Sequence, residues 1–314
     1  MLFRSSNTAW CHPILFQRIK AAKVQRPHLK VVVIDPRETA TNEIADLHLP
    51  IKAGADVLLF NALLADVVDK GLVDSDFVAN HTKGLADTIK AAQQDVGDGS
   101  TVAERLGVTA EALATLKTWF ANTPKTMTLF SMGVNQSSSG TDKVNAIVNC
   151  HLATGRIGKA GAAPFSLTGQ PNAMGGREVG GLANMLAAHM EIENPAHRHL
   201  VQRFWQSPNI ASHAGLKAVD LFDAMDEGKI KAIWIMATNP VVSLPNADKV
   251  RAALAKCELV VVSDCIANTD TTRMAHVLLP SLGWGEKDGT VTNSDRRISR
   301  QRAFLAAPEQ AKPG

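Results

Sequence analysis

The sequence has 314 residues, of which 45% are hydrophobic, and its formal net charge at pH 7 is +3. This charge is too small to indicate nucleic-acid binding, and the chain contains no block of Lys and Arg residues. No segment approaches eighteen consecutive apolar residues, so we expect no transmembrane helix and no membrane partner. The first residues lack a signal-peptide pattern, which predicts a cytoplasmic protein of one large or two medium domains.

Cysteine usage and the standard motifs exclude several classes of site. The cysteines form no C-x-x-C pair, and none has a His at zinc-finger spacing; they are Cys11, Cys150, Cys257 and Cys265. We therefore expect reduced thiols, mostly buried, and no metal ligands among them. The chain also lacks a G-x-G-x-x-G after a strand, a P-loop, H-E-x-x-H and G-x-S-x-G, which disfavours a simple NAD enzyme and a P-loop ATPase.

The first half of the chain alternates β-branched runs with helical patterns. A short apolar stub is followed by polar residues 5–7, and a helix is expected to start near Pro13. The further predicted elements of this half are a strand at 30–35, helices at 55–71 and 109–124, a strand followed by a turn at 126–133, and a helix at 143–155.

A Gly-rich passage at 155–181 separates this half from a second alternating series. That series consists of a helix at 218–230, a strand at 231–239, a helix at 246–257 and strands at 258–264 and 275–280. Strands separated by helices imply parallel sheets. We predict an α/β protein with two Rossmann-like, doubly wound domains at 1–165 and 166–314, and a cofactor groove between them.

Polar residues follow several of the predicted strands, where open α/β sheets bind ligands. Asn7 follows the first stub, and Asp35 occupies the place of an acid that binds ribose hydroxyls. Asn239 and the pair Ser263–Asp264 end two strands of the second half. Three of these residues also have a structural explanation, since Asp35 and Asn239 precede prolines in turn patterns and Asn7 could cap a helix.

The stretch "GQPNAMGGREVGG" at 169–181 contains five glycines and no apolar run. Its composition indicates a close backbone approach to some neighbour. Arg177 is the only Lys or Arg residue in it.

Several motifs together resemble the molybdopterin oxidoreductase family. "MGVNQSSSGTDKVNAIVNCHLATGRIGKAG" and "GQPNAMGGREVGG" are similar to its signature, and "SNTAWCHPILFQRI", "IDPRETATNEIADLHLPIKAGAD" and "LLPSLGWGEKDGTVTNSDRRISRQR" resemble its bacterial assimilatory nitrate reductases. The resemblance covers essentially the whole chain.

This resemblance implies a molybdenum ion held by two molybdopterin guanine dinucleotides. It assigns the first dinucleotide to Asn7, Asp35, Gly54 and Asp56, the pterin to Met132 and Gln136, and the second dinucleotide to Asn239, Ser263, Asp264 and Lys287. It assigns nitrate to Arg177, with Glu178 as an orienting partner, and makes Met132 a wall of the catalytic pocket. A structural Arg177–Glu178 pair at a domain junction is the alternative.

The resemblance also implies segments that this sequence does not contain. On the family pattern, the metal-ligating Cys and a [4Fe-4S] cluster belong to a missing N-terminal part, a further cofactor-binding domain follows the chain, and Ser5 stands where relatives carry Gly. We therefore expect an internal fragment that is inactive alone.

The resemblance implies that the complete enzyme reduces nitrate to nitrite by two-electron oxygen-atom transfer. It further implies that the electrons come from ferredoxin, flavodoxin or an NADH-dependent reductase subunit. A formate dehydrogenase or another oxyanion reductase of the family, and a non-catalytic nucleotide-binding module, are the alternatives.

Overall fold

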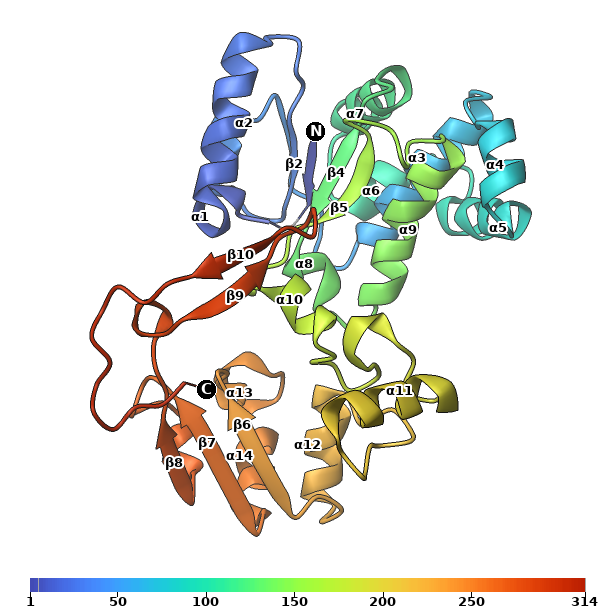
Figure 1. Cartoon of the computed structure of the whole chain (residues 1–314). Helices are drawn as coiled ribbons and strands as arrows, with labels where there is room; N and C mark the ends of the chain where they lie inside the picture. The colour runs from blue at the N-terminus through green and yellow to red at the C-terminus, as the bar shows by residue number, and fades with distance from the viewer. Residues whose placement is uncertain (5, 314) are drawn as a thin grey trace. The chain divides into compact units, whose positions relative to one another are not determined.

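The computed structural model describes residues 1–4 and 6–313, so Ser5 lies outside the described residues. The chain divides into two compact units, Met1–Gly169 and Gln170–Gly314 (Figure 1). The elements of the first unit are β1 (Leu2–Arg4), α1 (Thr8–Cys11), α2 (Pro13–Gln25), β2 (Val32–Ile34), η1 (Ala40–Ile44), β3 (Leu47–Leu49), α3 (Asp56–Asp69), α4 (Ser75–His81), α5 (Leu85–Val96), α6 (Val102–Leu106), α7 (Ala110–Asn122), β4 (Met127–Phe130), α8 (Met132–Asn135), α9 (Gly140–Ala153) and β5 (Ala163–Ser166).

The first unit is built on a five-stranded sheet in the order β3-β2-β1-β4-β5. All four strand pairs are parallel, with Phe3 of β1 opposite Val33 and Leu129. Alternate side chains enter two separate cores, because Val32 belongs to one cluster while Phe3 and Val33 belong to another. The predicted α/β class with parallel sheets is confirmed.

Local sequence signals explain both ends of α7. Thr109 caps α7 by accepting a hydrogen bond from the Ala112 amide at 3.1 Å, and α7 ends before Pro124 as predicted. The turn expected after β4 is instead the short helix α8, which starts at Met132. β3 and β5 are additional strands that the sequence patterns did not reveal.

The second unit contains a smaller sheet and a hairpin. Its elements are α10 (Ala173–Glu178), η2 (Ala187–His189), α11 (Pro195–Trp205), α12 (Ala218–Asp226), β6 (Ala232–Met236), α13 (Pro240–Ser243), α14 (Ala247–Lys256), β7 (Leu259–Asp264), η3 (Thr272–Met274), β8 (Val277–Pro280), η4 (Trp284–Glu286), β9 (Gly289–Thr292) and β10 (Ile298–Gln301). β6, β7 and β8 are parallel neighbours, whereas β9 and β10 pair antiparallel. Ile235 and Val260 pack with Phe222 of α12 and Leu254 of α14 in the core of this unit.

Two of the four cysteines are buried and two are exposed. Cys150 and Cys257 are buried, whereas Cys11 and Cys265 are exposed, one in each unit. The Cys150 thiol donates to the Phe60 carbonyl at 3.1 Å, and burial raises its pKa to about 12. The thiols are therefore less uniformly buried than the sequence suggested.

Within the described residues, no helix combines the length and the apolar character needed to span a membrane. The same part of the chain contains no group of three or more His, Cys, Asp and Glu residues arranged to hold a metal ion.

Candidate functional site

The carboxyl edge of the first sheet gathers the residues predicted for the first dinucleotide. The strand order reverses at β1 and β4, which makes the edge beyond these strands the topological switch point of the sheet. Asn7 follows β1, and its side-chain oxygen accepts a hydrogen bond from Thr41 at 3.3 Å. Met132 follows β4, and a Cβ added at Gly169 would lie only 2.9 Å from its terminal methyl. Gln136 is exposed at the end of α8.

Asp35 and Gly54 lie at the same edge, after β2 and β3. The Asp35 carboxylate accepts a hydrogen bond from the Arg37 amide at 2.9 Å, which forms the turn that the sequence offered as an alternative. The Asp35 side chain remains only partly buried. Gly54 has φ +88°, and a Cβ at this position would meet no atom within 4 Å. The backbone at Gly54 therefore faces open space beyond the strand ends.

Asp56 differs from its neighbours because it is completely buried. Its carboxylate contacts the Arg4 guanidinium and lies 3.2 Å from the Lys143 ammonium. Burial lowers the pKa of Arg4, and the charge of Asp56 opposes that effect. The three buried groups carry a net charge of about +1. The Asp56 carboxylate therefore lies in a buried ion cluster and is not exposed at the sheet edge.

In the second unit, the carboxyl ends of β6 and β7 carry the residues predicted for the second dinucleotide. The Asn239 side-chain oxygen accepts a hydrogen bond from the buried Thr271 hydroxyl at 2.5 Å. The Ser263 hydroxyl accepts one from the Trp234 indole at 2.9 Å. Asp264 holds its own turn, because its carboxylate accepts from the Ile266 amide at 3.0 Å.

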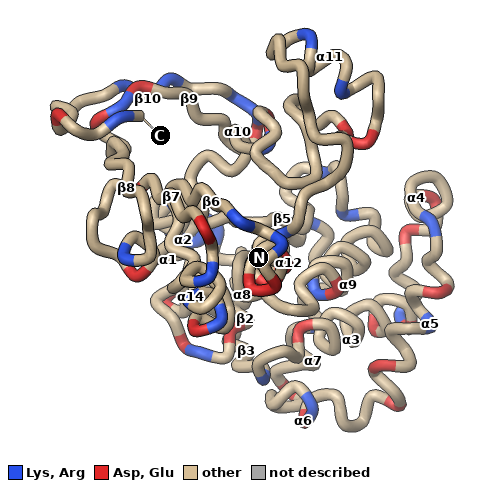
Figure 2. Tube along the Cα trace, turned by 90° about the horizontal axis from the view of Figure 1, so that it is seen from below, with Lys and Arg blue, Asp and Glu red and all other residues tan. Residues whose placement is uncertain are grey.

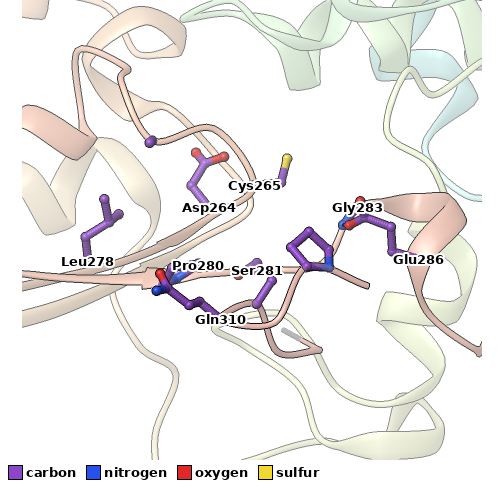
Figure 3. A pocket seen from close by; sticks show the side chains of 11 residues that line it. Asp264, Cys265, Leu278, Pro280, Ser281, Gly283, Glu286 and Gln310 are labelled. Carbon is purple, nitrogen blue, oxygen red and sulfur yellow. The ribbon is translucent and has the colours of Figure 1, made fainter. Parts of the chain in front are cut away.

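A cavity of about 340 Å³ opens beside Asp264. Figure 3 shows the Asp264 and Cys265 side chains next to each other above Ser281 and Gln310. Glu286 lines the cavity as well, and Lys287 is the next residue in the chain. This volume is within the usual range for small-molecule sites, and the lining offers carboxylate, amide and hydroxyl groups for hydrogen bonds.

Arg177 lies on α10, and its side chain is exposed. Among residues 1–4 and 6–313 its guanidinium has no ion-pair or hydrogen-bond partner. Glu178 instead contacts Arg296, with 2.8 Å between a carboxylate oxygen and a guanidinium nitrogen. The expected Arg177–Glu178 contact is therefore absent from the described residues, because adjacent residues on a helix point in different directions.

The glycines of 169–181 bring segments of the second unit's own backbone together. Gly180 has φ +77°, and a Cβ there would lie 2.6 Å from the Ala187 amide nitrogen. A Cβ at Gly181 would lie 2.9 Å from the Gly176 carbonyl oxygen. The composition indicated a close approach but not its partners, which are the start of η2 at Ala187 and the backbone of α10 at Gly176.

Comparisons with known proteins identify the family of the chain. The family model described as molybdopterin oxidoreductase matches residues 1–314. The chain is 54% identical over 308 residues to a nitrate reductase of Shewanella frigidimarina (strain NCIMB 400), covering 98% of the chain and 33% of that protein. It is 52% identical over 307 residues to a nitrate reductase of Klebsiella oxytoca, covering 98% of the chain and 34% of that protein.

The chain thus spans about a third of the length of these curated relatives. The structure of acetylene hydratase from Pelobacter acetylenicus superposes with a TM-score of 0.72 at 21% identity, covering 99% of this chain and 45% of that one. At this identity the superposition supports the fold alone. Since the family model matches the chain from end to end, the chain belongs to the molybdopterin oxidoreductase family.

Proposed function

We propose that the chain is the central cofactor-binding part of a molybdenum nitrate reductase of the assimilatory type. The reaction is the reduction of nitrate to nitrite by oxygen-atom transfer, with two electrons and two protons consumed and water released. The observation that carries the proposal is Arg177, an exposed guanidinium without a protein partner among the described residues, in a motif that resembles those of nitrate reductases. Such a group is free to donate paired hydrogen bonds to a planar oxyanion.

The residues present fit a cofactor in the form of two guanine dinucleotides. At the first sheet edge, the open space at Gly54 admits a ligand close to the backbone, and Asp35 offers a partly exposed carboxylate to ribose hydroxyls. In the second unit, the cavity beside Asp264 has the volume and polarity for a nucleotide group. Lys287, partly exposed, supplies a positive charge for a phosphate.

When bound, the molybdenum centre supplies the two-electron oxygen-atom chemistry. The chain's own residues bind nitrate and the cofactor and orient them. Arg177 holds the nitrate oxygens and offsets their negative charge, and Met132 forms an apolar, non-titrating wall. Gln136 and Asn7 donate and accept hydrogen bonds at the first sheet edge. We assign no general base, because water can deliver the protons.

The remaining partners are part of the same proposal. Electrons reach the enzyme from ferredoxin, flavodoxin or an NADH-dependent reductase subunit in the cytoplasm. A [4Fe-4S] cluster in a further part of the enzyme would supply the electron transfer.

The test is made on the full-length gene product, purified with its cofactor. We expect bound molybdenum, two guanine nucleotides per molybdenum after acid release, and nitrite formation from nitrate with a reduced viologen. Formate-dependent dye reduction without nitrite formation would identify a formate dehydrogenase instead. A protein that binds guanine nucleotide but neither molybdenum nor nitrate would be a binding module, and the proposal would be wrong.

A further inference from the structure

Helix α10, which carries Arg177, is intrinsically weak. It has six residues, and Gly175 and Gly176 are adjacent in its middle. Glycine costs conformational entropy in a helix, and isolated helices of this length are marginal in water. The position of α10 must therefore be fixed by contacts from other segments of the second unit.

The first contact holds the N-terminal end of α10 on the β9–β10 hairpin, which lies beside it in Figure 1. The Asn172 side-chain oxygen accepts a hydrogen bond from the Thr292 amide at 2.8 Å, and its nitrogen donates to the Thr290 carbonyl at 3.4 Å. The carboxamide thus pairs with the open edge of β9 as a further strand would. Gly175 makes this possible, since a Cβ there would lie 2.2 Å from the Asn172 oxygen.

The second contact holds the C-terminal end. Arg296, in the turn of the hairpin, donates a hydrogen bond to one carboxylate oxygen of Glu178 at 3.0 Å, and the same guanidinium nitrogen lies 2.8 Å from the other oxygen of this ion pair. His189 lies 3.5 Å from the same carboxylate. Figure 2 shows the charged residues along this hairpin. Asn172, His189 and Arg296 all have positive φ, of 57°, 58° and 62°. A non-glycine backbone in this region persists only where its surroundings enforce it.

Arg177 lies between these two contacts and has no side-chain partner within the part of the chain that the structure describes. Its position therefore depends on the backbone of α10 alone. We propose that Asn172 and the Glu178–Arg296 ion pair are positioning residues, which fix α10 on the hairpin and thereby direct the Arg177 guanidinium toward nitrate. This inference rests on the proposed role of Arg177.

The test uses Glu178→Gln and Asn172→Gly in the full-length protein. The first variant removes the charge but keeps the shape, and the second keeps the positive φ accessible but removes the carboxamide. We expect kcat/KM for nitrate to fall about tenfold, mainly through a higher KM, since a misplaced binding group loses orientation. Amide exchange at Val179, Gly180 and Gly181, whose N–H groups bond to α10 carbonyls, should become several-fold faster.

Arg300→Gln is the matched control, because Arg300 forms an ion pair with Asp288 at 3.3 Å in the same hairpin. It should behave like the wild type. In an Arg177→Ala background, Glu178→Gln should cause no further loss of kcat/KM, because it acts through Arg177. The inference would be overturned if the losses of kcat/KM from Arg177→Ala and Glu178→Gln were additive. It would also be overturned if amide exchange in Glu178→Gln and Asn172→Gly were no faster than in the Arg300→Gln control. If the wild type forms no nitrite, the proposed function fails, while the exchange data still decide whether these contacts hold α10.

Discussion

The two units hold their predicted ligand-binding residues by different means. In the first unit these residues follow strands of a sheet with a core on each face, and the buried Arg4–Asp56–Lys143 cluster lies behind them. In the second unit Arg177 lies on a short helix held by partly exposed contacts, and the Arg296 side chain is 66% exposed. We infer that substitutions at the first sheet edge change ligand binding and global stability together, whereas those on α10 change substrate binding and the local stability of α10 only.

The largest expected effect is a loss of unfolding free energy when the buried Arg4–Asp56–Lys143 cluster is changed. Asp56→Ala leaves two cations without their buried counter-charge, which typically costs about 3–5 kcal/mol of unfolding free energy. Asp66→Ala is the matched control on the same helix, because Asp66 forms a partly exposed pair with Lys70 at 2.7 Å. That loss should stay below about 1 kcal/mol. Urea unfolding of both variants measures the difference in unfolding free energy. Similar losses in Asp56→Ala and Asp66→Ala would contradict the view that the buried cluster stabilises the first unit.

The next effect is a pH dependence of stability that arises in the first unit. His151 is buried and bonded to the Thr128 hydroxyl at 2.8 Å, and desolvation followed by the Arg156 charge lowers its pKa to about 4. As pH falls below about 6.5, the unfolded chain binds a proton at this residue while the folded chain does not. The unfolding free energy should therefore decrease by up to about 3 kcal/mol on approach to pH 4.

His151→Gln provides the control for this dependence. The variant is expected to be less stable at neutral pH, because the buried hydrogen bond is altered, but to lose less stability on acidification than the wild type. Urea unfolding at several pH values measures both slopes. Parallel slopes would show that His151 is not the titrating group.

The smallest expected effect on free energy concerns Arg177. A bidentate, charge-assisted contact contributes about 1.5–3 kcal/mol, so Arg177→Ala should lower kcat/KM for nitrate roughly ten- to a hundredfold. Arg177→Lys should retain only part of the wild-type kcat/KM, because an ammonium group lacks the planar, two-pronged donor geometry of a guanidinium.

Bound molybdenum and the thermal midpoint should stay at wild-type values, since the guanidinium has no partner in the described residues. Normal kinetics with a lowered midpoint would assign Arg177 a structural role and remove the contrast between the units.

Helices and strands that are marked by local sequence patterns could be predicted from the sequence. The β-branched runs located β2 and β7, and Thr109 and Pro124 marked the ends of α7. The three residues of β3 and the four of β5 are strands because parallel neighbours supply their hydrogen bonds, which no local pattern encodes. The same applies to α8, which replaces a predicted turn after Ser131.

Polar strand ends could be predicted because parallel strands share a carboxyl edge. Their partners could not. Asp56 was expected at the cofactor, but its burial depends on Arg4 and Lys143, from distant parts of the chain. Likewise, the contact between Glu178 and Arg296 joins residues 118 positions apart. Pairings of this kind follow from the tertiary fold rather than from spacing in the sequence.

Because of where the cysteines lie, thiol labelling of the unmodified chain can measure whether the cavity beside Asp264 is occupied. Cys150 ionises too weakly to react with alkylating reagents at neutral pH, and Cys257 is buried. Cys265 is exposed and lines the cavity beside Asp264, while Cys11 is exposed on the other unit. A molecule that fills the cavity shields Cys265 from a maleimide. The ratio of labelling at Cys265 to that at Cys11 therefore reads out occupancy of the cavity without any substitution.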